Sequence, residues 1–486
     1  MKSDSMKKNF FFQFTYQIVI LFIPLITAPY LTRTLGDNAL GIYSYSNSIV
    51  NYFIIFAMLG IMKHGQRIIA TRKNDEIKLR KTFWSLFVLH FIISTISIIA
   101  YIIILALFRF DSKYIYVIQI IYIMSAIFDV TWLFYGLENF KSIVIKNFIF
   151  KILECINIFI FVKNPNDLWK YTVIMSISIF LGQFKIFIQA IKIIKPIDIA
   201  KADILEHIKP MIIFSITVIA ISLYSVFDKI LLGILDTVES VAYYEYSNKI
   251  INIPKSLIAV AGTVLFPRAC DCFFNNDLMT LKKYFKTSLM ITFFIGIGSI
   301  FGLLGISDLF SILYYGYDFQ SCGNIIKALS PVVLILGLGD IVRNQYLIPM
   351  KKDLEYTICI IGNAIINLIL SFTFIPKIGI YGAILGTCAA ELFGLIIQIY
   401  ICRKLIDVKL ILKTLLPFLF SGLFMYVIIK FIANIYNNTY FDLLIQIFVG
   451  MLVYIINLLI YFLFVDKDKN IYKQYLKNNI INRKKI

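Results

Sequence analysis

Several ionisable residues lie inside long apolar stretches of this sequence, where a charge is costly. A charged side chain at the centre of a bilayer costs about 2.5–3.5 kcal/mol on insertion scales, so it usually faces a partner or a wet cavity. Basic groups there can bind a phosphate, and acidic groups can bind a coupling cation or proton. The residues that we assign to substrate binding are Arg33, Lys151, Lys185, Asp228, Lys229, Lys249 and Arg343. The candidates for cation coupling are Asp129, Glu154, Glu245, Asp340 and Glu391.

The spacing of these residues predicts which of them pair within one helix. Lys151 and Glu154 are three residues apart, as are Asp340 and Arg343, and Glu245 and Lys249 are four apart. Such spacings put both partners on one helix face. Local neutralisation during membrane insertion is the alternative interpretation of each pair. Lys185 has no carboxylate at such a spacing, and Arg33 lies at the end of an apolar run, where it can reach the interface.

Motifs of enzyme chemistry are absent from the sequence. It contains no phosphate-binding loop, nucleophile elbow or zinc-binding motif. The seven Cys are scattered, apart from Cys270 and Cys272, and read as small apolar side chains. We therefore expect neither an enzyme nor a metalloprotein, and no cofactor.

The elements that must position these charges are membrane-spanning helices. The chain is 60% hydrophobic and only 15% charged, whereas a soluble chain has about 25% charged residues. A spanning helix needs about 20 apolar residues. Fourteen runs meet this length, and we predict an all-α polytopic membrane protein. They cover residues 10–32, 39–62, 82–108, 113–136, 141–162, 169–194, 208–233, 240–266, 284–306, 325–349, 354–376, 379–402, 411–434 and 440–465.

Basic residues alternate between the connections of these runs. The stretch "KHGQRIIATRKNDEIKLRK" follows the second run, and the connections after every second run are basic in the same way, as is the tail. Basic loops stay in the cytoplasm, so we expect both termini there, in a bacterial cytoplasmic membrane. This distribution also explains the net charge of +19 without nucleic-acid binding.

A short motif occurs twice at the same topological position. "IYSYSNSI" at 42–49 opens the second run, and "YYEYSNKI" at 243–250 opens the eighth. The offset of six spans preserves orientation, so runs 1–6 and 7–12 form a parallel repeat, with the substrate path between the halves. We expect a first lobe at 1–200, a second at 201–405, and two extra helices with a basic tail at 406–486.

Four stretches resemble bacterial polysaccharide flippases of the Wzx type, in the multidrug/oligosaccharidyl-lipid/polysaccharide exporter superfamily. They are "PLITAPYLTRTLGDNALGIYSYSNSIVNYF" (24–53), "WLFYGLENFK" (132–141), "FDKILLGILDTVESVAYYEYSNKI" (227–250) and "NAIINLILSFTFIPKIGIYGAILGTCAAEL" (363–392). The resemblance implies two six-helix lobes with two peripheral helices. It also implies that Arg33 occupies a basic position of the family, that Asp228 and Lys229 form its acidic-basic pair, and that Lys249 faces the cleft.

The function that the resemblance implies is translocation of an undecaprenyl-diphosphate-linked oligosaccharide for O-antigen or capsule assembly, by alternating access. The implied partners are this lipid-linked substrate, membrane lipids, a polysaccharide polymerase and assembly proteins, and we expect a monomer. Coupling to Na⁺ or H⁺ stays open as the energy source. The alternatives are a cation-coupled multidrug exporter, disfavoured by the excess of intramembrane cations, and a membrane glycosyltransferase or polymerase, disfavoured by the short connections.

Overall fold

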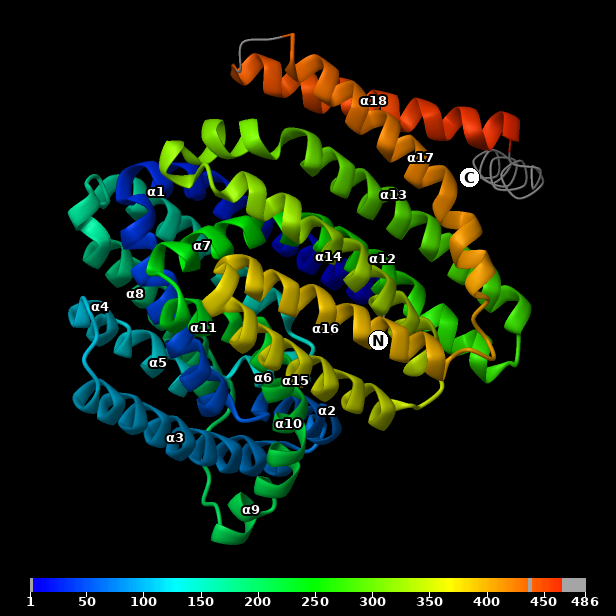
Figure 1. The fold of residues 1–486 in the computed structure, drawn as a ribbon. Helices are drawn as coiled ribbons and strands as arrows, with labels where there is room; N and C mark the ends of the chain where they lie inside the picture. Colours follow the sequence, from blue (N-terminus) through cyan, green and yellow to red (C-terminus); the bar gives the residue numbers. More distant parts are fainter. Residues whose placement is uncertain (1–2, 436–438, 466–486) are drawn as a thin grey trace. The chain divides into compact units, whose positions relative to one another are not determined.

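The chain is helical throughout the part that the computed structural model describes, residues 3–435 and 439–465, and no strand occurs there (Figure 1). The helices of the first half are α1 (Ser3–Met58), α2 (Ile61–Arg72), α3 (Glu76–Leu107), α4 (Lys113–Ile118), α5 (Ile120–Ile127), α6 (Thr131–Gly136), α7 (Phe140–Phe161), α8 (Leu168–Ile193) and α9 (Lys201–Leu205). Those that follow are α10 (Ile208–Ser225), α11 (Phe227–Leu235), α12 (Val238–Phe274), α13 (Leu278–Phe310), α14 (Cys322–Val342), α15 (Asp353–Ile378), α16 (Ile380–Ile401), α17 (Val408–Ala433) and α18 (Tyr440–Ile460).

Eleven described helical segments are long and apolar enough to cross a membrane, which confirms an all-α membrane protein. One segment, Ile23–Arg72, contains two of the predicted runs, so the eleven segments account for twelve of the fourteen. The other two runs are also helical. The run at 141–162 is α7, whose four charged residues set it apart, and the run at 208–233 is divided into α10 and α11 at Val226.

Helix boundaries follow local capping and breaking residues. Gly36 has φ 76° and ψ 176° inside α1, a conformation open to glycine, and it separates the first two predicted runs. The α3 helix begins after Asp75, whose carboxylate accepts a hydrogen bond from the Lys78 amide at 3.1 Å. Bonds from the backbone and side chain of Lys78 lower the pKa of Asp75. The predicted run at 113–136 is divided into α4, α5 and α6.

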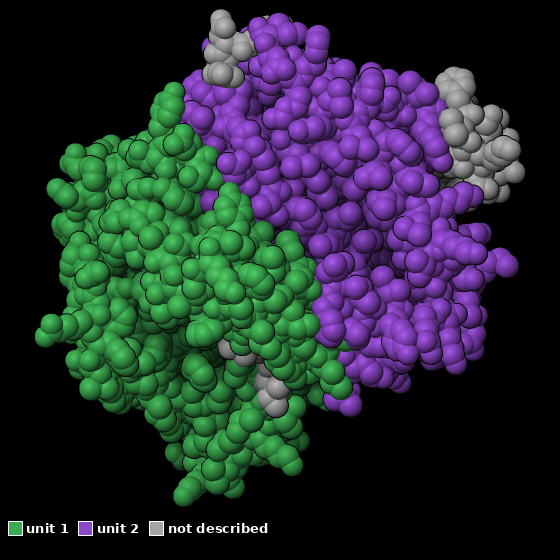
Figure 2. Space-filling view, viewed as in Figure 1, with its two compact units in different colours: residues 1–249, 314–321, 357–390 green, residues 250–313, 322–356, 391–486 purple. Residues whose placement is uncertain are grey.

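The helices gather into two compact units, coloured separately in Figure 2. Unit 1 comprises residues 1–249, 314–321 and 357–390, and unit 2 comprises 250–313, 322–356 and 391–486. The division passes through α12 and α16, so it differs from the predicted lobe boundaries at 200 and 405, which remain predictions. Packing contacts define the units, whereas a sequence repeat defines the lobes.

Each unit has its own buried core. In unit 1, Phe83, Trp132 and Phe134 are fully buried in one cluster, and Val50 and Tyr101 in a second. In unit 2, residues of α13, α14, α17 and α18 form one cluster. Lipid is as apolar as these side chains, so close packing rather than the hydrophobic effect holds such helices together.

The segments that carry the two copies of the repeated motif contact each other within unit 1. The motif recurs at an offset of 201 residues (244 − 43), and Asn38 Nδ2 donates to Glu239 Oε1, also 201 residues away, at 2.5 Å. Asn38 and Glu239 therefore occupy equivalent positions in the two copies, and equivalent positions contact each other where they lie next to a two-fold axis. The Tyr243 hydroxyl donates to Asp37 in the same region. These contacts agree with a parallel repeat.

A glycine allows the closest approach of α1 and α12. A Cβ atom added to Gly41 would lie 2.1 Å from the Val238 carbonyl oxygen, so the backbones would have to separate. Small residues serve this purpose in membrane helices.

We therefore expect Gly41→Ala to destabilise the protein by about 1–3 kcal/mol, as overpacking does. Thermal unfolding of the purified protein in detergent measures this effect. Gly302→Ala is the matched control, because its added Cβ would lie 3.8 Å from the Met425 methyl group, an ordinary contact. Equal melting temperatures for the two variants would show that the approach of α1 to α12 is not needed.

Candidate functional site

Two ion pairs on neighbouring helices form the centre of the candidate site in unit 1. Lys151 Nζ lies 2.6 Å from Glu154 Oε1 on α7, which confirms the pair predicted from their spacing. Lys229 Nζ on α11 lies 3.0 Å from Glu245 Oε2 on α12. Glu154 is buried, and the other three side chains are between 17% and 29% exposed. Most of the charge is therefore partly accessible.

Lys249 is the third cation of this group, and the pairing predicted for it is wrong. Glu245 forms its ion pair with Lys229 of the adjacent helix, while Lys249 Nζ lies 3.7 Å from the centre of the Tyr246 ring. Spacing within one helix could not reveal a competing cation on another helix. Lys249 remains close enough to Glu245, Lys229 and Lys151 for electrostatic interaction.

Tyrosines connect the two ion pairs. The rings of Tyr43 on α1 and Tyr171 on α8 are 4.6 Å apart, and both residues are within electrostatic range of Glu154. Tyr171 is also within range of Glu245, and Tyr43 of Tyr246. We define the cation–tyrosine cluster as Tyr43, Lys151, Glu154, Tyr171, Lys229, Glu245, Tyr246 and Lys249. Its three cations and two carboxylates leave one positive charge for a ligand.

Asp228 forms a separate polar cage with neutral partners. Its carboxylate accepts bonds from Thr387 Oγ1 at 2.7 Å, Tyr244 at 3.1 Å, Ser371 at 3.2 Å and Asn367 at 3.4 Å. The residue is only 1% exposed. The ion-pair partner of Lys229 is Glu245 rather than Asp228, because adjacent helical residues do not face each other. The roles that the family resemblance implies for Asp228 and Lys229 remain predictions.

A second polar network in unit 1 contains Asp129 and a lysine missing from the predicted site. Gln183 Nε2 on α8 donates to Asp129 Oδ2 at 3.0 Å, and Lys146 Nζ on α7 donates to Gln183 Oε1 at 3.0 Å. Lys146 is only 5% exposed. The rule that found the other candidates, a charge inside an apolar run, could also have found this residue.

Two predicted cations lie outside both groups. Lys185 Nζ lies 5.8 Å from the Phe150 ring centre. Arg33 is exposed, and its stem lies beside Gly316 within unit 1. Substrate binding by these two residues remains a prediction.

Unit 2 holds the remaining predicted residues. Arg343 lies 2.7 Å from Asp340, which confirms that pair, and donates to the Tyr356 hydroxyl at 2.8 Å. Glu391 on α16 is 8% exposed and within electrostatic range of Lys255, Asp340 and Arg343. These residues form a charge-balanced group within unit 2.

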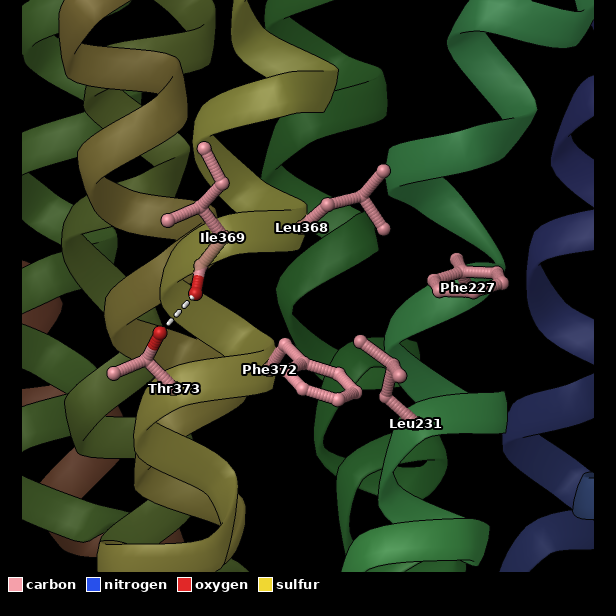
Figure 3. Close-up of a pocket in the computed structure, with 6 residues that line it drawn as sticks. All are labelled: Phe227, Leu231, Leu368, Ile369, Phe372 and Thr373. Atoms are coloured by element: carbon pink, nitrogen blue, oxygen red, sulfur yellow. Dashed lines mark hydrogen bonds between the residues drawn. The ribbon is translucent and has the colours of Figure 1, made fainter.

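An apolar pocket lies between α11 and α15 in unit 1, with a volume of about 340 Å³. Figure 3 shows Phe227 and Leu231 facing Leu368 and Phe372 across it. The Thr373 hydroxyl donates to the Ile369 carbonyl at 2.6 Å, so the lining offers little polarity. The pocket can take hydrocarbon but not a charged headgroup.

Comparison with known protein families identifies the family of this chain. The family model of the polysaccharide biosynthesis protein matches residues 6–273, more than half of the chain. The chain belongs to this polysaccharide biosynthesis protein family. The match covers every residue of the cation–tyrosine cluster.

Two similar proteins are named for the transport or flipping of glycans. It is 24% identical to a protein named as an O-antigen transporter from Shigella dysenteriae, over 79% of this chain and 97% of the relative. It is also 24% identical to a protein named as a low-salt glycan biosynthesis flippase from Haloferax volcanii, over 49% of this chain and 50% of that one.

Solved structures show which fold this family member has. The lipid II flippase MurJ, in an inward closed conformation, matches with a TM-score of 0.75 at 18% identity, over 93% of this chain and 98% of that chain. An inward-facing multidrug transporter of the MATE family, in the MOP superfamily, matches with a TM-score of 0.58 at 14% identity, over 79% and 97%. Both likenesses concern the fold alone.

Proposed function

We propose that this polysaccharide biosynthesis protein is a flippase, which moves a lipid-linked oligosaccharide across the bacterial cytoplasmic membrane by alternating access. The family, the relatives named for O-antigen transport and glycan flipping, and the MurJ-like fold support the proposal. We further propose undecaprenyl diphosphate as the lipid carrier, and a polysaccharide polymerase and assembly proteins as partners of a monomeric transporter. The glycan serves the O-antigen or capsule.

The cation–tyrosine cluster is the observation that carries this proposal. A diphosphate needs cationic donors when it leaves water, and each contact strengthens as the local dielectric constant falls. Lys249 is suited to this role because its ammonium lies over the Tyr246 ring, while the other two lysines already have carboxylate partners. The tyrosine rings and hydroxyls beside it can contact sugar faces and hydroxyl groups.

The same excess of positive charge argues against a cationic drug as substrate. A drug exporter that binds cations would need unpaired carboxylates at this place, whereas Glu154 and Glu245 are each held by a lysine. The MATE-like fold does not alter this argument, because unrelated substrates use one fold.

We expect Lys249→Ala to reduce surface glycan about tenfold or more at normal membrane abundance, since a bond between charged groups contributes about 1.5–3 kcal/mol. Glycan display normalised to membrane protein, in a strain that lacks the native copy, measures this. Lys413→Ala is the matched control, because this exposed lysine on α17 lies in a predicted span but outside the cluster and the predicted substrate-binding residues. Normal glycan with Lys249→Ala would contradict the cationic site, and equal losses in both variants would indicate a nonspecific effect of removing an intramembrane charge.

The orientation in the membrane is also a proposal, based on the alternation of basic connections. We expect reporter fusions after Ile486 and within 63–81 to report the cytoplasm, and fusions within 434–440 to report the outside. An outside signal at Ile486 would mean that the number of spans is odd.

We propose that the Asp228 cage binds the coupling cation, Na⁺ or H⁺. Carboxylate, hydroxyl and amide oxygens are hard ligands of the kind that alkali cations take, and the described neighbours of Asp228 leave its negative charge unbalanced. A ligand at ten times its dissociation constant adds about 1.4 kcal/mol of stability. We therefore expect Na⁺ to raise the melting temperature of the wild type more than K⁺ does, and to have no such effect on Asp228→Asn. No difference between the salts would leave H⁺ as the coupling ion.

A further inference from the structure

Lys146 is a buried lysine that belongs neither to the cation–tyrosine cluster nor to the Asp228 cage. It lies on α7 and is 5% exposed. The only hydrogen bond given to its ammonium among the described residues goes to the Gln183 amide oxygen at 3.0 Å. An ammonium has three donors, so this cation is poorly compensated for its loss of water.

The nearest carboxylate is separated from Lys146 by one amide. Gln183 accepts from Lys146 with its oxygen and donates to Asp129 with its nitrogen, at 3.0 Å each. Among the described side chains, no ion pair joins Lys146 to Asp129 directly. The amide orientation matches a charged lysine and an ionised aspartate, and the reversed amide would match a neutral amine and a protonated acid. The hydrogen bonds of Gln183 can therefore accommodate Lys146 either as an ammonium or, with the amide reversed, as an amine.

Asp129 is the titratable part of this network that is accessible from outside the protein. It lies at the break between α5 and α6 and is partly exposed, whereas Lys146 is buried. Thr131 holds the other carboxylate oxygen through its amide at 3.0 Å and its hydroxyl at 2.5 Å. A proton leaving the lysine can thus reach accessible space through Asp129.

Three other titratable side chains lie near this network, but none is hydrogen-bonded to it in the described part. His90 on α3 is fully buried and donates to, or accepts from, no carboxylate in the described part; its Nε2 lies 2.6 Å from the Ala126 carbonyl oxygen. His90, Tyr122 on α5 and Tyr135 on α6 are within electrostatic range of Asp129. In the part of the chain that the structure describes, none of the three forms a hydrogen bond with Lys146.

We propose that Lys146, Gln183 and Asp129 form a proton-exchange site in unit 1, in which Lys146 releases its proton through Asp129 and regains it once per transport cycle. The ligand is a proton, and the ammonium becomes an amine when it leaves. The use of this proton in transport rests on the proposed flippase function, whereas the exchange itself does not. The site is distinct from the Asp228 cage and from the cation–tyrosine cluster.

Lysine-to-arginine exchange separates a proton carrier from a fixed cation, because arginine keeps its charge at every pH at which the protein folds. We expect Lys146→Arg to reduce normalised surface glycan at least tenfold at normal membrane abundance. Lys141→Arg, on the same helix five residues away, should retain most of the display, because Lys141 is exposed and lies outside the cation–tyrosine cluster. Wild-type display by Lys146→Arg, together with loss of display by Lys249→Ala, would overturn the use of this proton in transport.

A direct measurement of protonation makes the test independent of glycan and of variant folding. In the full-length protein in nanodiscs, with nitrogen-15-labelled lysine side chains, a neutral amine gives a resonance separate from those of ammonium groups. We expect one buried resonance to titrate in the wild type and in Lys141→Arg, to be absent from Lys146→Arg, and to titrate at a different pH in Asp129→Asn. If every lysine stays an ammonium over the folded pH range, the proton site is refuted. If Lys146 titrates but Lys249→Ala and Lys146→Arg both leave glycan unchanged, the site stands and the flippase function fails.

Discussion

Every feature of this molecule depends on the cost of charge inside a membrane. An apolar helix can insert with almost any sequence, but a lysine or glutamate within it must find a partner, a ligand or a route to water. The chain carries such residues on α7, α11, α12, α14 and α16, and almost all of them are paired or caged in the described part. The distribution of these compensations therefore separates structural charges from charges left for a ligand.

Within unit 1 three modes of compensation occur side by side. Lys151 and Lys229 each hold a carboxylate, which neutralises them in place. Asp228 has hydroxyl and amide partners, which stabilise the carboxylate without cancelling its charge. Lys146 reaches a carboxylate only through an amide. The first mode tolerates a fixed charge, the second accommodates a cation, and the third allows the charge itself to disappear.

Much of the fold could be predicted from the sequence because membrane insertion is governed by local properties. The length and apolarity of each run, and the side on which basic residues follow it, are readable one segment at a time. The repeated motif also explains the contact between Asn38 and Glu239, because these two residues are 201 positions apart, which is the offset of the repeat. The break of the fourth run at Asp129 could not be read in this way, because a mid-span carboxylate and a capping carboxylate look alike in sequence.

The candidate site could be predicted only in part because pairing is a property of neighbouring helices. Spacing within one helix correctly gave the partners of Lys151 and Arg343. It failed for Glu245, because Lys229 on α11 competes for it. It gave no partner for Asp228, whose hydrogen-bond donors come from α12, α15 and α16. Helix order along the chain does not say which faces meet.

The repeated motif itself shows how one sequence acquires two roles. Tyr43 in the first copy lies within range of Glu154 and so belongs to the cation–tyrosine cluster, whereas its equivalent in the second copy, Tyr244, binds Asp228. The two copies retained the tyrosine while the charges around it diverged. The proposed anion-binding cluster and the proposed cation-binding cage thus each contain one copy of this tyrosine, within a single compact unit. The proposed exchange of an anionic lipid for a cation requires both sites, and a repeated motif with different neighbours can supply them without a new fold.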